Sequence, residues 1–198
     1  MTIFTATKWT SNAELIADVA KLGYLDGDVL DVTYGLGTFW KQWRPEHLTA
    51  CDINPTKSPI GYSVDFTHLP FGKLSFDAVV LDPPYKLNGT PTEEVDDRYG
   101  VHIVRSWQYR LQLIELGILE CSQVARRYLL LKCQDQVCAG QKRWQTYQFT
   151  KCGEACGLIL VDRFDMLGTP RPQPAGRRQV HTQVNYSTLL VFRKGDVR

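Results

Sequence analysis

The sequence predicts an α/β fold in which helices cover both faces of a mostly parallel, doubly wound sheet. Apolar runs of strand length alternate with segments of helical periodicity along the 198 residues, a pattern typical of this fold class. One apolar run, 29–32, leads into a turn with two glycines, and another, 78–81, ends in the tetrapeptide Asp82-Pro83-Pro84-Tyr85. Ligands bind at the carboxyl ends of the strands in such sheets. We therefore expect the functional site where these two runs end.

The first expected element is a helix, because Ser11 and Glu14 have the spacing of a capping box. The expected elements are a helix from 12 to about 22, strands at 29–32 and 48–51 with a short helix near Phe39 between them, a strand at 78–81, a helix from 107 to 124, a strand at 128–132, a helix from about 144 to 156, and strands at 158–162 and 186–192. In the helix 107–124, apolar residues recur at helical spacing, which predicts a face packed on the core. The last strand lies close to its predecessor in the sequence, which suits an antiparallel hairpin.

Length and composition predict a single domain, 1–198. With 43% hydrophobic residues, the chain can bury a full α/β core and has little room for a second module. A net charge of +2 is too small to indicate a nucleic-acid binder, although basic residues crowd the second half of the chain. No apolar stretch reaches the length of about 18 residues that spans a membrane, and the first residues lack a signal-peptide pattern. We expect a cytoplasmic protein without a membrane partner.

The tetrapeptide Asp82-Pro83-Pro84-Tyr85 predicts methylation of an amino group. The amine of a nucleobase is a poor nucleophile because its lone pair is delocalised into the ring. Asp82 and the carbonyl of Pro83 can each accept one N–H of the amine, which directs the lone pair at a methyl donor. The prolines restrict the backbone and hold that carbonyl in place. The ring of Tyr85 offers a surface on which a planar base can stack.

The turn after the strand at 29–32 has the character of a nucleotide-binding turn. Gly35 and Gly37 would allow the backbone to approach a ligand closely. Asp31 stands at the tip of the strand, within reach of a cationic amino group. A pair of glycines at this spacing is by itself a weak signal, and its weight comes from the acidic residues that follow.

Those acidic residues come at the ends of later segments. About twenty residues beyond Asp31, the next strand ends in Asp52-Ile53, the position from which an acidic side chain binds ribose hydroxyls in such folds. Asp65-Phe66 precedes the strand that leads to the tetrapeptide, and the Asp65 carboxylate is a candidate acceptor for an adenine amine. The order and spacing of these carboxylates favour a dinucleotide-like or nucleoside cofactor.

Taken in order, these motifs resemble the class I S-adenosylmethionine-dependent methyltransferases, specifically the adenine-N6 and cytosine-N4 DNA methyltransferases that carry Asp-Pro-Pro-Tyr. The resemblance extends from Lys8-Trp9-Thr10 to the strand at 186–192, and so covers most of the chain. The segments 171–174 and 176–181 are similar to small phage or prophage DNA methylases. No insert is long enough to be a separate sequence-reading domain.

The resemblance implies a Rossmann-like class I methyltransferase fold, with the last strand antiparallel beside the strand at 128–132, and S-adenosyl-L-methionine as cofactor. It assigns catalysis to Asp82, Pro83, Pro84 and Tyr85. The implied cofactor-binding residues are Lys8, Thr10, Asp31, Thr33, Tyr34, Gly35, Gly37, Thr38, Asp52, Ile53, Asp65, Phe66 and Asp82. Thr33 and Tyr34 depart from the family pattern, which often has Phe or Pro at these positions.

Two long loops should open at the ligand-binding edge of the sheet. Loop 86–106 follows the tetrapeptide and is interpreted as a lid, and loop 167–184 as a substrate-binding loop. The expected nucleic-acid contacts in these loops are Arg98, Tyr99, Arg171, Arg177, Arg178 and His181. In an alternative interpretation, the arginines pair with the acidic run of the first loop, and the nucleic-acid surface lies around Lys142 and Arg143.

The six cysteines predict reduced thiols rather than a metal site. Cys133 with Cys138 and Cys152 with Cys156 are too loosely spaced to indicate zinc, and no metal is expected. Cys133 follows the strand at 128–132, where some RNA cytosine-C5 methyltransferases carry a nucleophile. We regard it as a half-buried structural thiol, with the nucleophile as the alternative.

We conclude from the sequence that the protein transfers a methyl group from S-adenosylmethionine to an exocyclic amine of a nucleobase, with adenine N6 in DNA as the expected target. Direct displacement at the sulfonium carbon requires no covalent enzyme intermediate. Cytosine N4 in DNA and an adenine-N6 or guanine-N2 amine in RNA are alternative targets. A catalytically silent, cofactor-binding nucleic-acid module is an alternative of a different class. The target sequence and the oligomeric state do not follow from the sequence.

Overall fold

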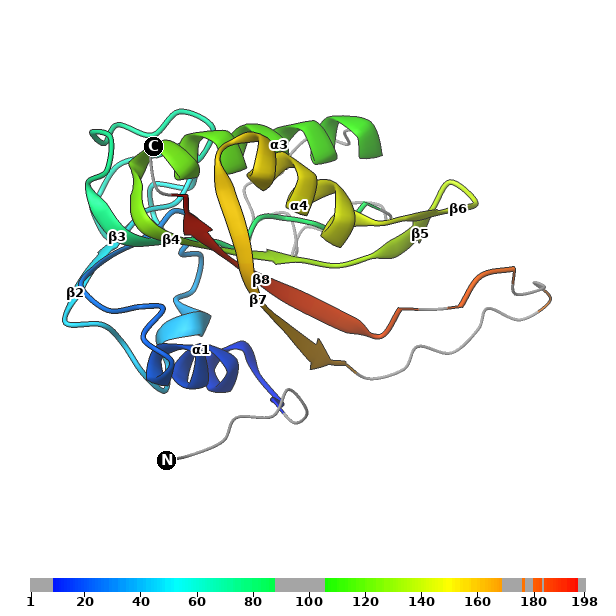
Figure 1. Cartoon of the computed structure of the whole chain (residues 1–198), viewed down its shortest axis with the longest axis horizontal. Helices are drawn as coiled ribbons and strands as arrows, with labels where there is room; N and C mark the ends of the chain where they lie inside the picture. Colours follow the sequence, from blue (N-terminus) through cyan, green and yellow to red (C-terminus); the bar gives the residue numbers. More distant parts are fainter. Residues whose placement is uncertain (1–8, 88–105, 169–175, 177–179, 183, 196–198) are drawn as a thin grey trace.

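The structure is a computed structural model that describes residues 9–87, 106–168, 176, 180–182 and 184–195. Within these residues, a six-stranded sheet has the strand order β2-β1-β3-β4-β8-β7 (Figure 1). Its strands are β1 (Asp28–Asp31), β2 (His47–Ala50), β3 (Phe76–Leu81), β4 (Ala125–Cys133), β7 (Leu158–Leu167) and β8 (Tyr186–Lys194). Strands β2, β1, β3 and β4 are parallel, and β8 is antiparallel to both β4 and β7. This confirms the expected sheet, with the last strand antiparallel beside β4.

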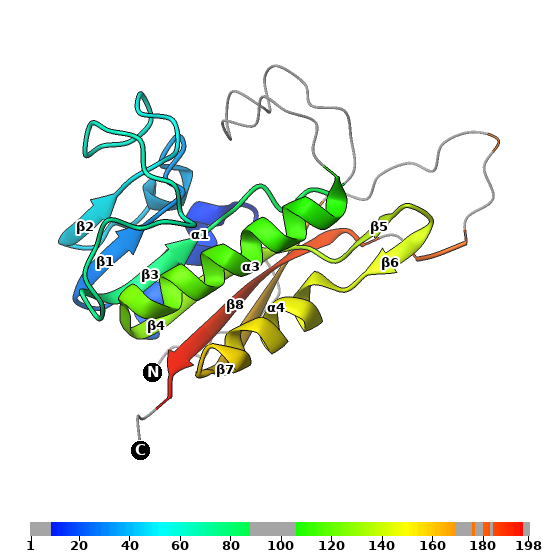
Figure 2. The same ribbon diagram turned by 90° about the horizontal axis from the view of Figure 1, so that it is seen from above.

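Helices cover both faces of the sheet (Figures 1 and 2). They are α1 (Asn12–Lys21), the 3-10 helix η1 (Thr38–Trp40), α3 (Trp107–Val124) and α4 (Gln145–Ala155). Neighbouring residues of β4 point to opposite faces, as a strand requires. Leu130 packs in one buried cluster with Leu15 of α1, whereas Leu129 packs in the other with Ile114 of α3. We call these two sides the α1 face and the α3–α4 face.

Strand β7 is longer than the sequence predicted. The expected strand stopped at 162, where charged residues interrupt the apolar run. In the structure, β7 pairs with β8 as far as Leu167, opposite Tyr186. Phe164 is buried on the α1 face, and Met166 packs against the same cluster. The alternation of apolar and charged residues beyond 162 is therefore that of a strand with one buried face.

A short hairpin was not predicted. It consists of β5 (Gln136–Cys138) and β6 (Gln141–Arg143), which are antiparallel and form a second sheet. Ala139 and Gly140 connect them with positive φ angles of 51° and 73°. Positive φ at both central residues is typical of a two-residue hairpin turn, which usually contains Asn-Gly or Asp-Gly. Ala-Gly does not carry this signal, and the hairpin escaped prediction for that reason.

Helix α1 begins as the capping box predicts. The Ser11 hydroxyl accepts a hydrogen bond from the backbone N–H of Glu14 at 3.2 Å. The Glu14 carboxylate in turn accepts hydrogen bonds from the N–H and the hydroxyl of Thr10, at 2.7 and 2.8 Å. In the described part of the chain, none of the helices combines the length and the apolar character that crossing a bilayer requires.

Candidate active site

The two glycines of the turn after β1 have different roles. Gly35 and Gly37 have φ angles of 55° and 62°, in the left-handed region that favours glycine. A Cβ atom on Gly37 would lie 2.6 Å from the Tyr34 hydroxyl, so this glycine makes room for the Tyr34 ring. A Cβ atom on Gly35 would meet only a backbone oxygen at 3.9 Å. The peptide of Gly35 is therefore the part of the turn that a ligand can approach.

Asp31 lies at the end of β1 but points into the protein. It is 3% exposed, and its carboxylate accepts hydrogen bonds from the Thr33 N–H at 2.9 Å and from the Trp40 indole at 2.7 Å. Burial raises the pKa of Asp31 to about 7, although both hydrogen bonds oppose this shift. In this arrangement Asp31 fixes the start of the turn and η1. Its contact with a cationic amino group stays a prediction.

Asp52 joins the turns that follow the neighbouring strands β1 and β2. One carboxylate oxygen accepts a hydrogen bond from the Gly35 N–H at 2.8 Å, and the other accepts one from the Asn54 N–H at 2.8 Å. Gly35 and Asp52, both predicted to bind the cofactor, are thus hydrogen-bonded to each other. Ile53, next to Asp52, is 40% exposed beside this turn. An exposed apolar side chain at this position is suited to contact with a planar ring.

The residues of the third acidic position have different surroundings. The Asp65 carboxylate accepts hydrogen bonds from the N–H and the hydroxyl of Thr67, both at 2.8 Å. Phe66 is buried in the core of the α3–α4 face. It packs so closely on Gly117 of α3 that a Cβ atom there would lie 2.6 Å from the Phe66 ring. Phe66 therefore positions the loop against α3.

Asp82 is the first residue after β3. Its N–H donates a hydrogen bond to the Thr33 hydroxyl at 2.7 Å, which ties the tetrapeptide to the glycine turn. Its carboxylate oxygen Oδ1 is buried and has no hydrogen-bond partner among the described residues. Burial raises the pKa of Asp82 to about 6, and the charge of Lys132 partly offsets this. A buried acceptor without a partner is costly to stability and is an expected feature of a site that binds a donor.

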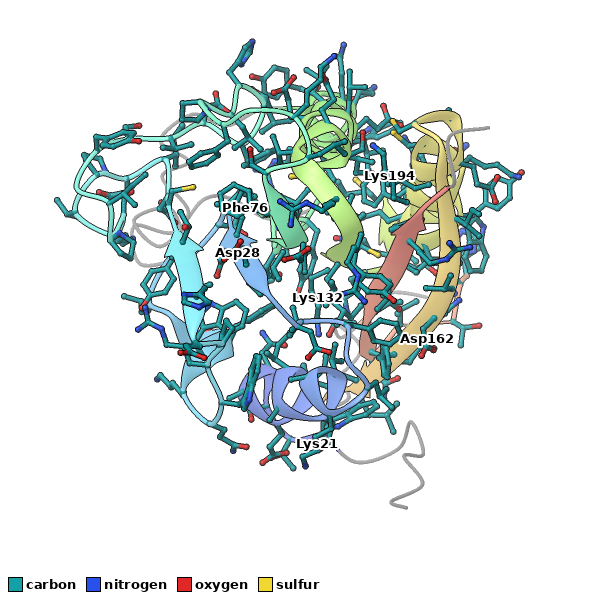
Figure 3. All side chains as sticks on the ribbon, turned by 60° about the vertical axis from the view of Figure 1, so that its left-hand side comes forward. Lys21, Asp28, Phe76, Lys132, Asp162 and Lys194 are labelled. Carbon is teal, nitrogen blue, oxygen red and sulfur yellow. The ribbon has the colours of Figure 1, made fainter. Side chains whose placement is uncertain are left out.

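Lys132 is a residue that our sequence analysis missed as a part of the site. Leu81 and Leu131 are paired in the register of β3 and β4, so Asp82 and Lys132 follow side by side at the sheet edge. The lysine is completely buried on the α1 face, and its ammonium group donates a hydrogen bond to the Asn12 side chain at 3.1 Å (Figure 3). Burial lowers the pKa of Lys132 to about 8, against the attraction of Asp82. A lone lysine inside an apolar run was the available signal, because lysine is almost never buried without a partner.

Two glutamines, one on the unpredicted hairpin and one at the start of α4, hold the other end of the tetrapeptide. The side-chain amides of Gln136 and Gln145 donate hydrogen bonds to the Tyr85 carbonyl at 2.7 and 2.8 Å. Gln136 also accepts a hydrogen bond from the Leu87 N–H at 2.9 Å. Within the tetrapeptide, the Tyr85 N–H donates to the Pro83 carbonyl at 2.7 Å, which makes a tight turn. The second lone pair of that carbonyl is available to a further donor.

Several predicted contact residues lie outside the described part of the chain. They are Lys8, Arg98, Tyr99, Arg171, Arg177 and Arg178, together with most of the expected lid at 86–106. His181 is described, and its ring nitrogen Nε2 lies 3.0 Å from the carbonyl oxygen of Gly140. Lys142 donates a hydrogen bond to the Thr182 carbonyl at 3.1 Å. The β5–β6 hairpin thus contacts the expected substrate-binding loop.

The remaining sequence hypotheses concern Thr10 and the cysteines. Thr10 is engaged by Glu14, as described above, and Thr38 is the first residue of η1. Cys133 is completely buried, not half-buried, and burial raises the pKa of its thiol, which disfavours the thiolate that a nucleophile requires. Among the described residues, no three His, Cys, Asp or Glu side chains are grouped so that they could hold a metal ion.

Comparison with known proteins identifies the fold. No family model and no curated protein sequence matches this chain. A protein of Bacillus halodurans assigned to the methyltransferases superposes with a TM-score of 0.59 at 14% identity, over 91% of this chain and 98% of that one. The magnesium protoporphyrin IX methyltransferase of Synechocystis, with bound S-adenosylmethionine, gives 0.55 at 14% identity, over 93% and 78%. The cyclase SpnF gives 0.54 at 16% identity, over 92% and 80%. The chain therefore has the Rossmann-like class I methyltransferase fold, which also carries other chemistry.

Proposed function

We propose that this protein is an S-adenosylmethionine-dependent methyltransferase that methylates an exocyclic amine of a nucleobase, with adenine N6 in DNA as the target. The observation that carries the proposal is the buried Oδ1 atom of Asp82, which has no hydrogen-bond partner within the described residues. It lies at the carboxyl edge of the sheet, next to the glycine turn, where ligands bind in this fold. A donor N–H from a substrate amine would satisfy it.

The residues around the glycine turn fit the proposed cofactor. The Asp52 and Asp65 carboxylates are acceptors, Gly35 lets a ligand approach the backbone closely, and the exposed Ile53 offers an apolar contact. Together they suit a nucleoside with an amino-acid tail. Asp52 would bind the ribose hydroxyls, and Asp65 the adenine amine. The bound cofactor supplies an electrophilic methyl group on a sulfonium centre. Similar structures with this fold include one with bound S-adenosylmethionine, which supports the assignment.

The tetrapeptide would orient the substrate amine. Asp82 Oδ1 and the Pro83 carbonyl each accept one N–H, which leaves the nitrogen lone pair directed away from both acceptors and toward the methyl group. The Thr33 hydroxyl fixes the backbone of Asp82, and the Gln136 and Gln145 amides fix that of Tyr85. Both ends of the tetrapeptide are thus held before a substrate arrives, which is the condition for preorganised catalysis.

Lys132 would keep Asp82 in the state that the reaction needs. An ionised carboxylate accepts two hydrogen bonds more strongly than a neutral one, but burial favours the neutral form. The neighbouring ammonium group opposes that effect. With Asp82 near pKa 6 and Lys132 near pKa 8, both groups are charged at neutral pH. Lys132 is therefore a positioning residue that acts through Asp82.

The decisive experiment is mass spectrometry of nucleosides from DNA and RNA of cells that express the protein. We expect N6-methyladenine in DNA from wild-type cells and background levels with Asp82→Ala. Asp26→Ala, which removes an exposed carboxylate before β1, is the matched control and should methylate normally. A methylated amine in RNA alone, or at cytosine N4, would reassign the target. Cofactor binding by calorimetry without any new methylated base would support the silent module instead.

A further inference from the structure

A groove on the α3–α4 face runs beside the candidate active site. It has a volume of about 680 Å³. Its walls come from the first half of α3, the end of β6 and the first half of α4, which lie side by side in Figure 2. The lining residues are Trp107, Leu111, Glu115, Lys142, Arg143, Trp144, Tyr147, Gln148, Lys151 and Cys152. Both large rings and cations are therefore present in one depression.

Two aromatic side chains of this groove are unusually open. Trp144 is 54% exposed and Tyr147 is 66% exposed. Trp144 is the N-cap residue of α4 and Tyr147 lies in its first turn, and both line the same groove. Large aromatic rings usually bury their faces, and an adjacent exposed pair that lines a depression marks a binding surface rather than a part of the core. Such rings can each stack on a planar group.

The charge of the groove is positive. The Arg143 guanidinium lies 3.8 Å from the centre of the Trp107 ring, and the Lys142 ammonium lies 5.0 Å from that of Trp144. Lys151 is the third lining cation, and its ammonium group is paired with the Glu154 carboxylate at 2.7 Å, so the positive charge without an acidic partner among the described residues comes from Lys142 and Arg143. Glu115 is the acidic residue of the lining, and its carboxylate already accepts a hydrogen bond from the Gln148 amide at 2.7 Å. The excess of positive charge in the groove favours an anionic ligand.

Arg143, one of the cations of the groove, has a buried nitrogen atom, Nε, without a hydrogen-bond partner among the described residues. The guanidinium carbon lies over the Trp107 ring, and this contact restricts the positions that the group can take. A planar fork of N–H donors held in this way is suited to the oxygens of a phosphate group. This observation is independent of the exposed rings and agrees with them.

The groove is connected to the tetrapeptide. Trp144 precedes Gln145, whose amide donates to the Tyr85 carbonyl. Lys142 and Arg143 belong to the hairpin that begins at Gln136, which bonds to the same carbonyl. An occupant of the groove would thus lie against the elements that fix the catalytic turn. This location is what a segment of substrate next to the reacting base requires.

We infer that this groove binds a segment of single-stranded nucleic acid that flanks the target base. Bases of the segment stack on Trp144 and Tyr147, and its phosphates lie at Lys142, Arg143 and Lys151. Stacking on an exposed ring requires a base that has left the duplex stack, which selects the single strand over the duplex. The inference rests on the proposed function and extends it, because it names the form of the substrate and a contact surface away from the two long loops.

The test is the affinity for a fluorescently labelled oligodeoxynucleotide of about 12 bases, measured by anisotropy on the full chain with cofactor present. Each base stacked on an aromatic ring is worth several-fold to about a hundredfold in affinity. We expect the double variant W144A/Y147A to bind at least about tenfold more weakly, and Trp144→Phe to retain most of the affinity. Tyr62→Ala, which removes an exposed ring elsewhere, is the matched control and should bind normally. Circular dichroism establishes that each variant is folded.

The salt dependence tests the cations separately. The double variant K142A/R143A should lower the log–log slope of affinity against salt by about 1.4 units, since each phosphate contact on a single strand contributes about 0.7. The control K73A/R127A removes two exposed cations at the opposite edge of the sheet and should keep the slope.

The possible outcomes separate this inference from the proposed function. If W144A/Y147A binds like wild type, or if wild type binds no single strand, the groove assignment is wrong. Methylation by wild type would in that case leave the proposed function intact. If the groove variants lose binding but wild type methylates nothing, the groove is confirmed and the proposed function fails. A preference for duplex that the groove variants do not change also overturns the inference.

Discussion

Two carboxylates, Asp135 and Asp82, follow neighbouring strands of the sheet, and their hydrogen bonds differ completely. Asp135, just after β4, is 2% exposed, and its two oxygens accept hydrogen bonds from the N–H and the hydroxyl of Thr146 at 2.9 to 3.0 Å. Asp82, just after β3, has a buried oxygen without a partner among the described residues. One carboxylate has the hydrogen bonds that burial demands, and the other does not.

The difference separates structural from catalytic use of the same side chain. By binding Thr146, Asp135 connects the end of β4 to the start of α4, which has no side-chain cap of its own. Its bonds stabilise the fold. The Oδ1 atom of Asp82 gains a hydrogen bond only when a ligand donates to it. Its position therefore favours ligand binding at a cost to the stability of the fold. The location of the two carboxylates relative to the strands does not distinguish them, because both follow a buried strand at the ligand-binding edge.

The comparison predicts opposite effects for two matched substitutions. Asp82→Asn should lower turnover by about 10²- to 10³-fold, the usual result of losing one preorganised contact to the reacting group. It should leave the free energy of unfolding at pH 7 no lower, because a desolvated charge is removed. Asp135→Asn should instead lower that free energy by about 1.5–3 kcal/mol, the value of hydrogen bonds to a charged group. Urea titration and initial rates measure both. Equal stability losses in the two variants would contradict the distinction.

The sequence allowed much of the fold and part of the site to be predicted. Strand and helix positions follow from apolar periodicity, and helix α3 was predicted to the residue because its stripe is unbroken. Gly35 and Asp52 were both assigned to the cofactor site, and their hydrogen bond to each other is a finding of the structure. The missing hydrogen bond at Asp82 Oδ1 could not be predicted from the sequence, because it depends on which residues pack around that atom in the folded protein.

The parts that escaped prediction have no local signal in the sequence. The β5–β6 hairpin has a turn without Asn or Asp, and its strands are only three residues long, so neither turn nor period signals it. Lys132 reads as a break in an apolar strand until Asn12, 120 residues away in the chain, is placed beside it. A hydrogen bond between two polar side chains that are far apart in the sequence leaves no local sequence pattern. These are the contacts that make up the α1-face side of the site.

Asp52 is an intermediate case that can sharpen the comparison. Like Asp135, it accepts hydrogen bonds with both oxygens, here from the backbone N–H groups of Gly35 and Asn54, yet it stands where the ribose hydroxyls of the proposed cofactor would bind. Asp52→Ala should weaken the binding of S-adenosylmethionine by about 1.5–3 kcal/mol, as for loss of a hydrogen bond to a charged group. Calorimetry measures this. Full affinity in a folded variant would place Asp52 with Asp135 as a purely structural carboxylate and move the ribose site elsewhere.

The smallest expected effect is a change in pH dependence and concerns Lys132. The charge of this lysine favours the ionised form of Asp82, so Lys132→Met should raise the pKa of Asp82 further above about 6. Because the reaction needs the ionised carboxylate, the acid limb of the rate–pH profile should move to higher pH. Above about pH 8, where Lys132 loses its proton, Asp82 is ionised in both proteins, so the two profiles should converge at alkaline pH.

Lys142→Met is the matched control for this prediction, because Lys142 lies on the hairpin on the other side of the tetrapeptide and donates to a backbone carbonyl rather than standing beside Asp82. Its removal should weaken substrate binding without moving the acid limb of the profile. Rates of methyl transfer under saturating substrate, at constant ionic strength, distinguish the two variants. A loss of stability alone would lower all rates of Lys132→Met by a common factor. An unmoved acid limb would therefore show that Lys132 supports the fold through Asn12 and does not act through Asp82.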